Sequence, residues 1–126
     1  MNVHVTNIYG FSPTSVVLIS QHEVRNIARI LGFNELALYI YDSSNEPMNE
    51  LSSRYDGIIA RVSPGDVVFF QSPTWNGVDW DNGLVDKLKA YGCRVVMFIQ
   101  DVQPLQFESN YYLMPKFISM YNKAEI

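Results

Sequence analysis

Hydroxyl, indole and amide side chains gather at 72–77, directly after an uninterrupted apolar run. An aromatic face packs against the C–H face of a sugar ring, and a neighbouring amide can bond to the sugar hydroxyls. A surface tryptophan without such a contact is unfavourable. We therefore predict that this segment binds substrate through Ser72, Thr74, Trp75, Asn76 and Gly77. The alternative is that Trp75 folds back onto its own domain.

A second candidate segment follows the first β-rich stretch and leads into a helix. It contains Tyr9, Gly10, Ser12 and Thr14. The N-terminus of a helix offers free N–H groups and a partial positive charge, which suit a phosphate or a hydroxyl-bearing ligand. The segment matches neither the dinucleotide nor the Walker glycine pattern. We predict that these four residues bind substrate, with a tight structural turn at Gly10 as the alternative.

A third segment carries two carboxylates after another apolar run. Asp101 follows that run directly, and Glu108 comes seven positions later. A carboxylate at the end of a buried strand can act as a general base, and burial there raises its pKa. We predict Asp101 as the catalytic residue and Glu108 as a substrate contact. A capping or loop-ordering role for Asp101 is the alternative.

The sequence lacks the residue sets that metal binding and nucleophilic catalysis by serine or cysteine require. His4 and His22 have no Cys, Asp or Glu at metal-ligand spacing, so both are interpreted as structural. The single cysteine, Cys93, precedes an apolar run and is interpreted as a small core residue. No Ser-His-Asp or Cys-His set can be proposed.

The elements that must position these segments alternate between strand and helix. Strands are predicted at 2–8, 36–41, 66–71 and 94–99, and helices at 12–31, 48–59, 80–91 and 114–121, with a long connection at 101–110. Ser12-Pro13 is a helix start, Gly32 ends that helix, and Pro115 stands in the first turn of the last helix.

This alternation predicts an α/β fold. Strands that are apolar on both faces are typical of a parallel sheet covered by helices, so we expect a Rossmann-like three-layer α/β/α domain. We expect the strand order 3-2-1-4. In such a sheet ligands bind beyond the carboxyl ends of the strands, which selects the loops 9–14, 71–77 and 100–110.

Length, composition and charge narrow the class of protein. The 126 residues suit one domain, and 48% hydrophobic residues are typical of a globular chain. The net charge of −4, with no basic run, disfavours nucleic acid and anionic membranes as partners. No signal peptide or spanning segment is visible. Because a lone cysteine makes no internal disulfide, we expect a reducing, cytoplasmic location.

Several motifs together resemble one protein family over nearly the whole chain. They are VTNIYG at 5–10, DGIIA at 56–60, GDVVFFQSPTWNG at 65–77, LKAYG at 88–92, FIQD at 98–101, PL at 104–105 and FESNYYLM at 107–114. They resemble the N-terminal domain of the glucosyltransferases that extend O-linked N-acetylglucosamine on serine-rich-repeat adhesins of Gram-positive bacteria. Related proteins are called galactofuranosyltransferase-like or nucleotide-sugar-synthetase-like. The segment 71–77 is the most specific part.

The resemblance implies one half of a GT-B enzyme, which has two Rossmann-like halves. The C-terminal half would bind most of a UDP-sugar, and this half would supply the acceptor site. Residues 1–126 are then a single acceptor-side domain, truncated before the donor-binding domain and inactive alone. The family implies no metal, no tightly bound cofactor, a glycan or glycopeptide acceptor and a possible homo-oligomer. Family members commonly have His before the residue matching Asp101, whereas this chain has Gln100.

Two other classes of function stay open from the residues. The segment 72–75 is similar to the second FMN loop of flavodoxins, although 9–15 is a thin match to a phosphate-binding loop. A flavodoxin-like electron carrier is therefore an alternative. A non-catalytic module that pairs with a separate chain is the other.

Overall fold

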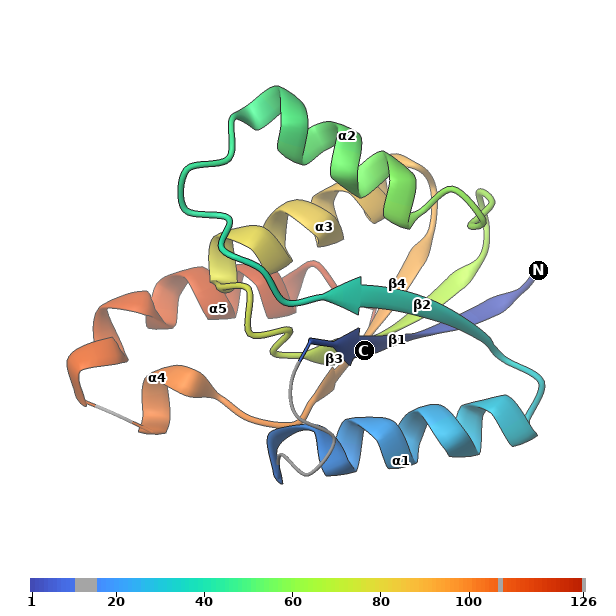
Figure 1. Ribbon diagram of the computed structural model, residues 1–126, viewed down its shortest axis with the longest axis horizontal. Coiled ribbons are helices and arrows are strands. Elements are labelled where there is room, and N and C mark those ends of the chain that lie inside the picture. Colours follow the sequence, from blue (N-terminus) through green and yellow to red (C-terminus); the bar gives the residue numbers. More distant parts are fainter. Residues whose placement is uncertain (11–15, 107, 126) are drawn as a thin grey trace.

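The domain has three layers, with one parallel sheet between two layers of helices (Figure 1). The computed structural model describes residues 1–10, 16–106 and 108–125. The strands are β1 (Val3–Tyr9), β2 (Asn34–Tyr39), β3 (Val67–Ser72) and β4 (Arg94–Ile99); the helices are α1 (Val16–Ile30), α2 (Met48–Ile58), α3 (Val78–Ala90), α4 (Gln103–Gln106), the 3₁₀ helix η1 (Glu108–Leu113) and α5 (Met114–Asn122). The predicted Rossmann-like α/β architecture is confirmed.

The predicted strand order 3-2-1-4 is wrong. The observed order is β2-β1-β3-β4, with β1 between β2 and β3. An interior strand needs burial on both faces, which β1 has from His4 to Ile8. By contrast β2 begins with the exposed Asn34 and ends with Tyr39, which is 62% exposed, so β2 suits an edge. The strand order therefore reverses between β1 and β3, where ligands bind in open α/β sheets.

The two strands at this reversal separate towards their carboxyl ends. The β1–β3 ladder contains only the pairs from Val3↔Val67 to Val5↔Phe69, whereas β1–β2 and β3–β4 each pair six residues. Beyond Phe69, side chains take over the bonding: the Gln71 backbone N–H donates to Thr6 Oγ1 at 2.8 Å, and Gln71 Nε2 donates to the Thr6 carbonyl at 2.7 Å. Buried backbone groups stay paired in this way while a gap opens between the strands.

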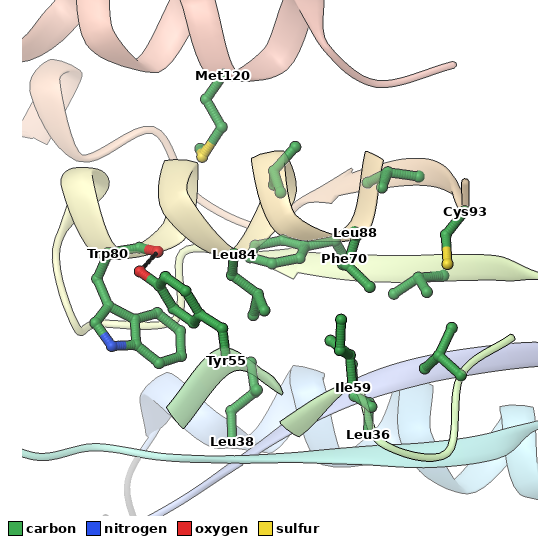
Figure 2. Packing of buried hydrophobic residues seen from close by; sticks show 14 of the residues in the cluster. Leu36, Leu38, Tyr55, Ile59, Phe70, Trp80, Leu84, Leu88, Cys93 and Met120 are labelled. Carbon is green, nitrogen blue, oxygen red and sulfur yellow. Dashed lines mark hydrogen bonds between the residues drawn. The ribbon is translucent and has the colours of Figure 1, made fainter. Parts of the chain in front are cut away.

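Most of the hydrophobic core lies between the sheet and the layer of α2, α3 and α5 (Figure 2). Phe70 and Leu38 of the sheet, Leu84 and Leu88 of α3 and Met120 of α5 are fully buried. Each such side chain stabilises the fold by about 1.5–3 kcal/mol. On the other face α1 packs against β1 and β2 (Figure 1). Cys93 is buried at 4% exposure, as predicted.

Two local predictions have different outcomes. The Gly32 ending of α1 is confirmed: Gly32 has φ +84°, and the Phe33 N–H donates to the Ala28 carbonyl at 2.9 Å. The long connection predicted at 101–110 instead contains α4 and the start of η1. The predicted start of the first helix at Ser12-Pro13 lies outside the described residues. None of the helices in the described part of the chain has the length and apolar composition that crossing a bilayer requires.

His4 has a structural partner at the opposite end of the sheet. Its Nε2 lies 2.9 Å from Asp66 Oδ2, and both side chains are buried. The backbone N–H groups of Asn2 and Ser63 also donate to Asp66. The Asn2 N–H, with His4 and the Ser63 N–H, lowers the pKa of the Asp66 carboxyl well below its usual value. This cluster fixes the start of β3, far from the predicted ligand loops.

The packing of Tyr55 over α3 gives a test of the fold. A Cβ at Gly83 would stand 2.6 Å from Tyr55 Oη, whose hydroxyl donates to the Trp80 carbonyl at 2.7 Å (Figure 2). We expect Gly83→Ala to lower the free energy of unfolding by about 1–3 kcal/mol, because this overpacking outweighs the better helix propensity of alanine. Urea denaturation followed by circular dichroism measures the change.

Gly57 of α2 is the matched control, since a Cβ there meets nothing within 4 Å. Gly57→Ala should be neutral or stabilise by up to about 1 kcal/mol. Equal unfolding midpoints for the two variants would contradict the assigned packing of Tyr55.

Candidate functional site

An aromatic-lined cleft of about 540 Å³ lies at the edge of the sheet where the strands end. Its two sides come from the segment after β2 and from the segment joining β3 to α3, so it extends past the end of β1, which lies between those strands. We call this the aromatic cleft; it is lined by Tyr41, Asp42, Ser43, Ser44, Leu51, Trp75, Asn76, Gly77, Val78, Asp79, Trp80 and Leu113. Its volume is in the range of small-molecule sites.

Trp75 lines this cleft in an unusual backbone conformation. Its φ is +69°, in the left-handed region that residues other than glycine rarely adopt. The side chain is partly buried against the core, and the buried indole Nε1 has no hydrogen-bond partner. The ring thus packs on its own domain and also forms a wall of the cleft, and binding of substrate by Trp75 stays a prediction.

Asn76 joins the two sides of the cleft. Its Nδ2 donates to the Tyr39 carbonyl at 2.9 Å, and its Oδ1 accepts from the Tyr41 backbone N–H at 3.1 Å. The amide retains one N–H and one oxygen lone pair for a ligand. Binding of sugar hydroxyls by Asn76 stays a prediction, and the geometry adds a structural role that the sequence did not indicate.

The segment after β2 supplies cleft residues that sequence reasoning missed. Trp80 Nε1 donates to the Tyr41 hydroxyl at 2.8 Å, and that hydroxyl donates to Glu46 at 2.6 Å. The Arg54 guanidinium lies 4.1 Å from the centre of the Tyr41 ring and donates to Glu46. Burial, followed by Glu46, raises the pKa of Tyr41. The rule that selected the other loops would have included this one, since it also follows the carboxyl end of a strand.

Ser72 and Thr74 lie beneath the cleft surface. Both are fully buried. The Thr74 hydroxyl and backbone N–H both bond to the Asp81 carboxyl of α3. Ser72 Oγ and the Tyr121 hydroxyl are both buried, and the Ser72 side chain partly offsets the burial that raises the pKa of Tyr121. The predicted substrate contacts of Ser72 and Thr74 stay predictions, and in this structure both residues support the cleft from below.

The residues predicted around the first loop are only partly described. The Tyr9 hydroxyl donates to Glu35 of β2 and accepts from Arg25 Nη1 of α1 at 3.4 Å. Gly10 has φ +110°, and a Cβ there would stand 3.4 Å from the Ile40 backbone. Ser12 and Thr14 lie outside the described residues. Neither Tyr9 nor Gly10 lines the aromatic cleft.

The third loop lies beside this edge rather than in the cleft. Asp101 is half-buried and interacts electrostatically with Tyr121. Gln100 is held by its neighbours: its Nε2 donates to Gln71 Oε1 at 2.7 Å, and its Oε1 accepts from Ser20 at 2.6 Å. Glu108 is exposed on η1. The cleft therefore brings together Trp75, Asn76 and Gly77 but neither predicted carboxylate.

The cleft combines aromatic surface with acidic side chains. Trp75, Trp80 and Tyr41 provide aromatic surface, and Asp42 and Asp79 provide acidic oxygens at the rim, where Asp79 is paired with Lys116 at 3.1 Å. The Ser44 hydroxyl and backbone N–H lower the pKa of Asp42, so it is ionised at neutral pH. Carboxylates accept hydrogen bonds from hydroxyls and repel phosphates. Within the described residues, no group of three or more His, Cys, Asp or Glu is placed to hold a metal ion.

The bridging role of Asn76 can be tested by stability. We expect Asn76→Ala to lower the free energy of unfolding by about 1–2 kcal/mol, because it removes two hydrogen bonds between the sides of the cleft. Asn45→Ala, at an exposed position in the adjacent loop, is the control and should change little. Urea unfolding measures both. An Asn76→Ala curve that overlays the Asn45→Ala curve would show that the amide does not hold the cleft together.

Known proteins match this chain along its whole length. Residues 2–126 match the family described as Glucosyltransferase 3-like, N-terminal domain. Glucosyltransferase 3 of Streptococcus gordonii is 51% identical over 125 residues, which cover 99% of this chain and 37% of that protein. Glucosyltransferase 3 of Streptococcus parasanguinis is 46% identical over 126 residues, which cover 100% of this chain and 38% of that protein. The chain spans less than two fifths of these relatives, and it belongs to the family of Glucosyltransferase 3-like N-terminal domains.

Proposed function

We propose that this chain is the acceptor-side half of a GT-B glucosyltransferase. The whole enzyme would transfer a hexose, most simply glucose, from a UDP-sugar to a glycan or glycoprotein such as O-linked N-acetylglucosamine on a Ser/Thr-rich adhesin. The observation that carries the proposal is the aromatic cleft with its acidic rim, located at the strand-order reversal of a chain from a glucosyltransferase family.

The charge of the cleft supports an acceptor rather than a nucleotide donor. A UDP-sugar carries a diphosphate, which the ionised Asp42 would repel, whereas the second carboxylate of the cleft, Asp79, is paired with Lys116 at 3.1 Å. An acceptor glycan is neutral, and its hydroxyls can donate to the same oxygens. The donor would then bind mainly to a second domain, and the relatives are long enough to contain one.

Asp101 is the candidate general base in this proposal. A base in glycosyl transfer removes the proton of the attacking hydroxyl, and Asp101 follows β4 at the same edge of the sheet as the cleft. Gln100 is already bonded to Gln71 and Ser20, so it orients the start of this loop. No metal or tightly bound cofactor takes part in the proposed reaction.

The two alternatives, a flavodoxin-like electron carrier and a non-catalytic partner module, can be compared with the fold and the cleft. The order β2-β1-β3-β4 also occurs in flavodoxins, so topology alone admits an FMN carrier. Membership of a glucosyltransferase family and the acidic rim of the cleft argue against one. A partner module is compatible with the exposed Tyr111, Tyr112 and Ile118 near the C-terminus. In our proposal such surface meets the enzyme's own second domain or another copy, in the cytoplasm.

Binding of an acceptor by the isolated chain tests the proposal. We expect a peptide with O-linked N-acetylglucosamine to bind, and Trp75→Ala to raise its Kd about tenfold because an aromatic wall of the cleft is lost. Isothermal titration calorimetry measures the affinities. Tyr91→Ala, an exposed aromatic position at the far end of α3, is the matched control and should bind as the parent chain does.

Two comparisons complete the test. The unglycosylated peptide should not bind, and the chain alone should transfer nothing from UDP-glucose, whereas a polypeptide with the length of the relatives should. Saturable binding of FMN with no binding of the glycopeptide would replace the acceptor proposal with the electron-carrier alternative.

A further inference from the structure

A buried carboxyl group lies directly behind the aromatic cleft. Asp81 stands in the first turn of α3 and is 1% exposed, yet it does not line the cleft. Negative side chains in the first turn of a helix usually lie at the surface, where they interact favourably with the helix dipole. Burial of such a group is costly unless it is hydrogen-bonded, so the bonds that it makes indicate what it does.

Both carboxyl oxygens of Asp81 bond to one residue. Oδ2 accepts from the Thr74 backbone N–H at 3.1 Å, and Oδ1 accepts from the Thr74 hydroxyl. Thr74 itself is fully buried. These two bonds determine both the backbone and the side-chain position of the residue that precedes Trp75.

From Thr74 the hydrogen bonds continue into the cleft. The Asn76 N–H donates to Thr74 Oγ1 at 3.3 Å, and the Asn76 amide bonds to the backbone of Tyr39 and Tyr41. Trp75 lies between these two anchored residues, with φ +69°. A left-handed conformation at a bulky residue persists only where its surroundings impose it. The bonds at Thr74 and Asn76 supply that constraint.

In the described part of the chain, Thr74 supplies the hydrogen bonds that favour the charged form of Asp81. The titratable side chains that interact with it are Tyr55 of α2 and Tyr121 of α5. Burial raises the pKa of both phenols, so they are neutral at physiological pH. Burial likewise raises the pKa of Asp81 to about 7, although the Thr74 bonds lower it. The strength with which Asp81 accepts from Thr74 therefore changes near neutral pH.

We propose that Asp81 is a positioning residue for ligand binding, because its carboxyl fixes the turn at 74–76 and so sets the place of Trp75 and Asn76 in the aromatic cleft. The part that concerns ligand affinity rests on the proposed acceptor function. The part that concerns the turn does not, since it can be observed without any ligand.

Nitrogen-15 NMR of the chain reports on the turn directly. The chain has two tryptophans, so the spectrum contains two indole signals, and Trp75→Phe assigns them. We expect Asp81→Ala to shift the Trp75 indole and the Asn76 side-chain amide signals. The same variant should raise the Kd of the N-acetylglucosamine peptide about tenfold, as expected for the loss of a hydrogen bond to a charged group.

The conservative variant separates positioning from charge. Asp81→Asn should keep the signals and the affinity near those of the parent chain, because the amide oxygen can accept from the Thr74 N–H and the amide nitrogen can donate to Oγ1. Asp86→Ala is the control on the same helix, since Asp86 pairs with Lys123 at the surface and should affect neither measurement. A folded Asp81→Ala chain with unshifted Trp75 and Asn76 signals would overturn the proposal.

Thr74 supplies a second pair of variants in case Asp81→Ala does not fold. Thr74→Ser keeps the hydroxyl that bonds to Asp81 and Asn76, whereas Thr74→Val replaces it with a methyl group. We expect the valine variant alone to shift the Trp75 and Asn76 signals. Identical spectra for the two variants would refute the role assigned to Asp81. If the parent chain does not bind the glycopeptide, the acceptor function fails, while the spectra still decide the role of Asp81.

A pH titration adds a readout that a purely steric role would not produce. In the parent chain the Trp75 indole and Asn76 amide signals should move between pH of about 6 and 8, as Asp81 ionises and its bonds to Thr74 strengthen. In Asp81→Asn the same signals should stay constant over this range. Signals that move equally in both proteins would assign the titration to another group and overturn the proposal.

Discussion

The separation of β1 and β3 beyond the pair Val5↔Phe69 shapes the edge of the sheet at which the aromatic cleft lies. If β1 and β3 were paired along their whole length, no gap would separate their carboxyl ends. Here the Thr6 and Gln71 side chains satisfy the backbone where the ladder stops, so the gap opens without leaving the Gln71 N–H unpaired. The gap also coincides with the reversal of strand order, and the helices that follow the two strands, α1 and α3, lie on opposite faces of the sheet (Figure 1).

The two sides of the cleft are joined by hydrogen bonds between polar groups as well as by the edge-to-face contact of the Tyr41 and Trp80 rings. Asn76 bonds to the backbone after β2, and Trp80 bonds through Tyr41 to Glu46. Hydrogen bonds fix direction more strictly than apolar contacts, which are non-directional. The core between the sheet and α3 supplies stability, and these few polar bonds supply the shape of the cleft.

The sequence predicts the elements of this fold well because their signals are local. The glycine that ends α1, the apolar runs of β3 and β4 and Pro115 in the first turn of α5 all act within a few residues. Strand order is not local, and only the exposed Asn34 and Tyr39 indicate that β2 lies at an edge. For the site, the rule that ligands bind beyond the carboxyl ends of the strands found Trp75, but it was not applied to the loop after β2, which it also covers. Asp81 was missed because an acidic residue in a first helical turn normally indicates a surface position.

The acidic rim constrains which domain of the proposed two-domain enzyme can bind the nucleotide-sugar donor. A site for a nucleotide sugar must compensate the charge of a diphosphate with cations or helix N-termini. The N-terminus of α3 faces this cleft, and Asp79 in its first turn is paired with Lys116, but the ionised Asp42 lines the cleft and opposes an anion. In the proposed enzyme, a cleft that binds a neutral, hydroxyl-rich acceptor is therefore unsuited to bind the donor diphosphate at the same place. A second domain that brings the donor from across the edge of the sheet satisfies both requirements, because it keeps the diphosphate away from these carboxylates.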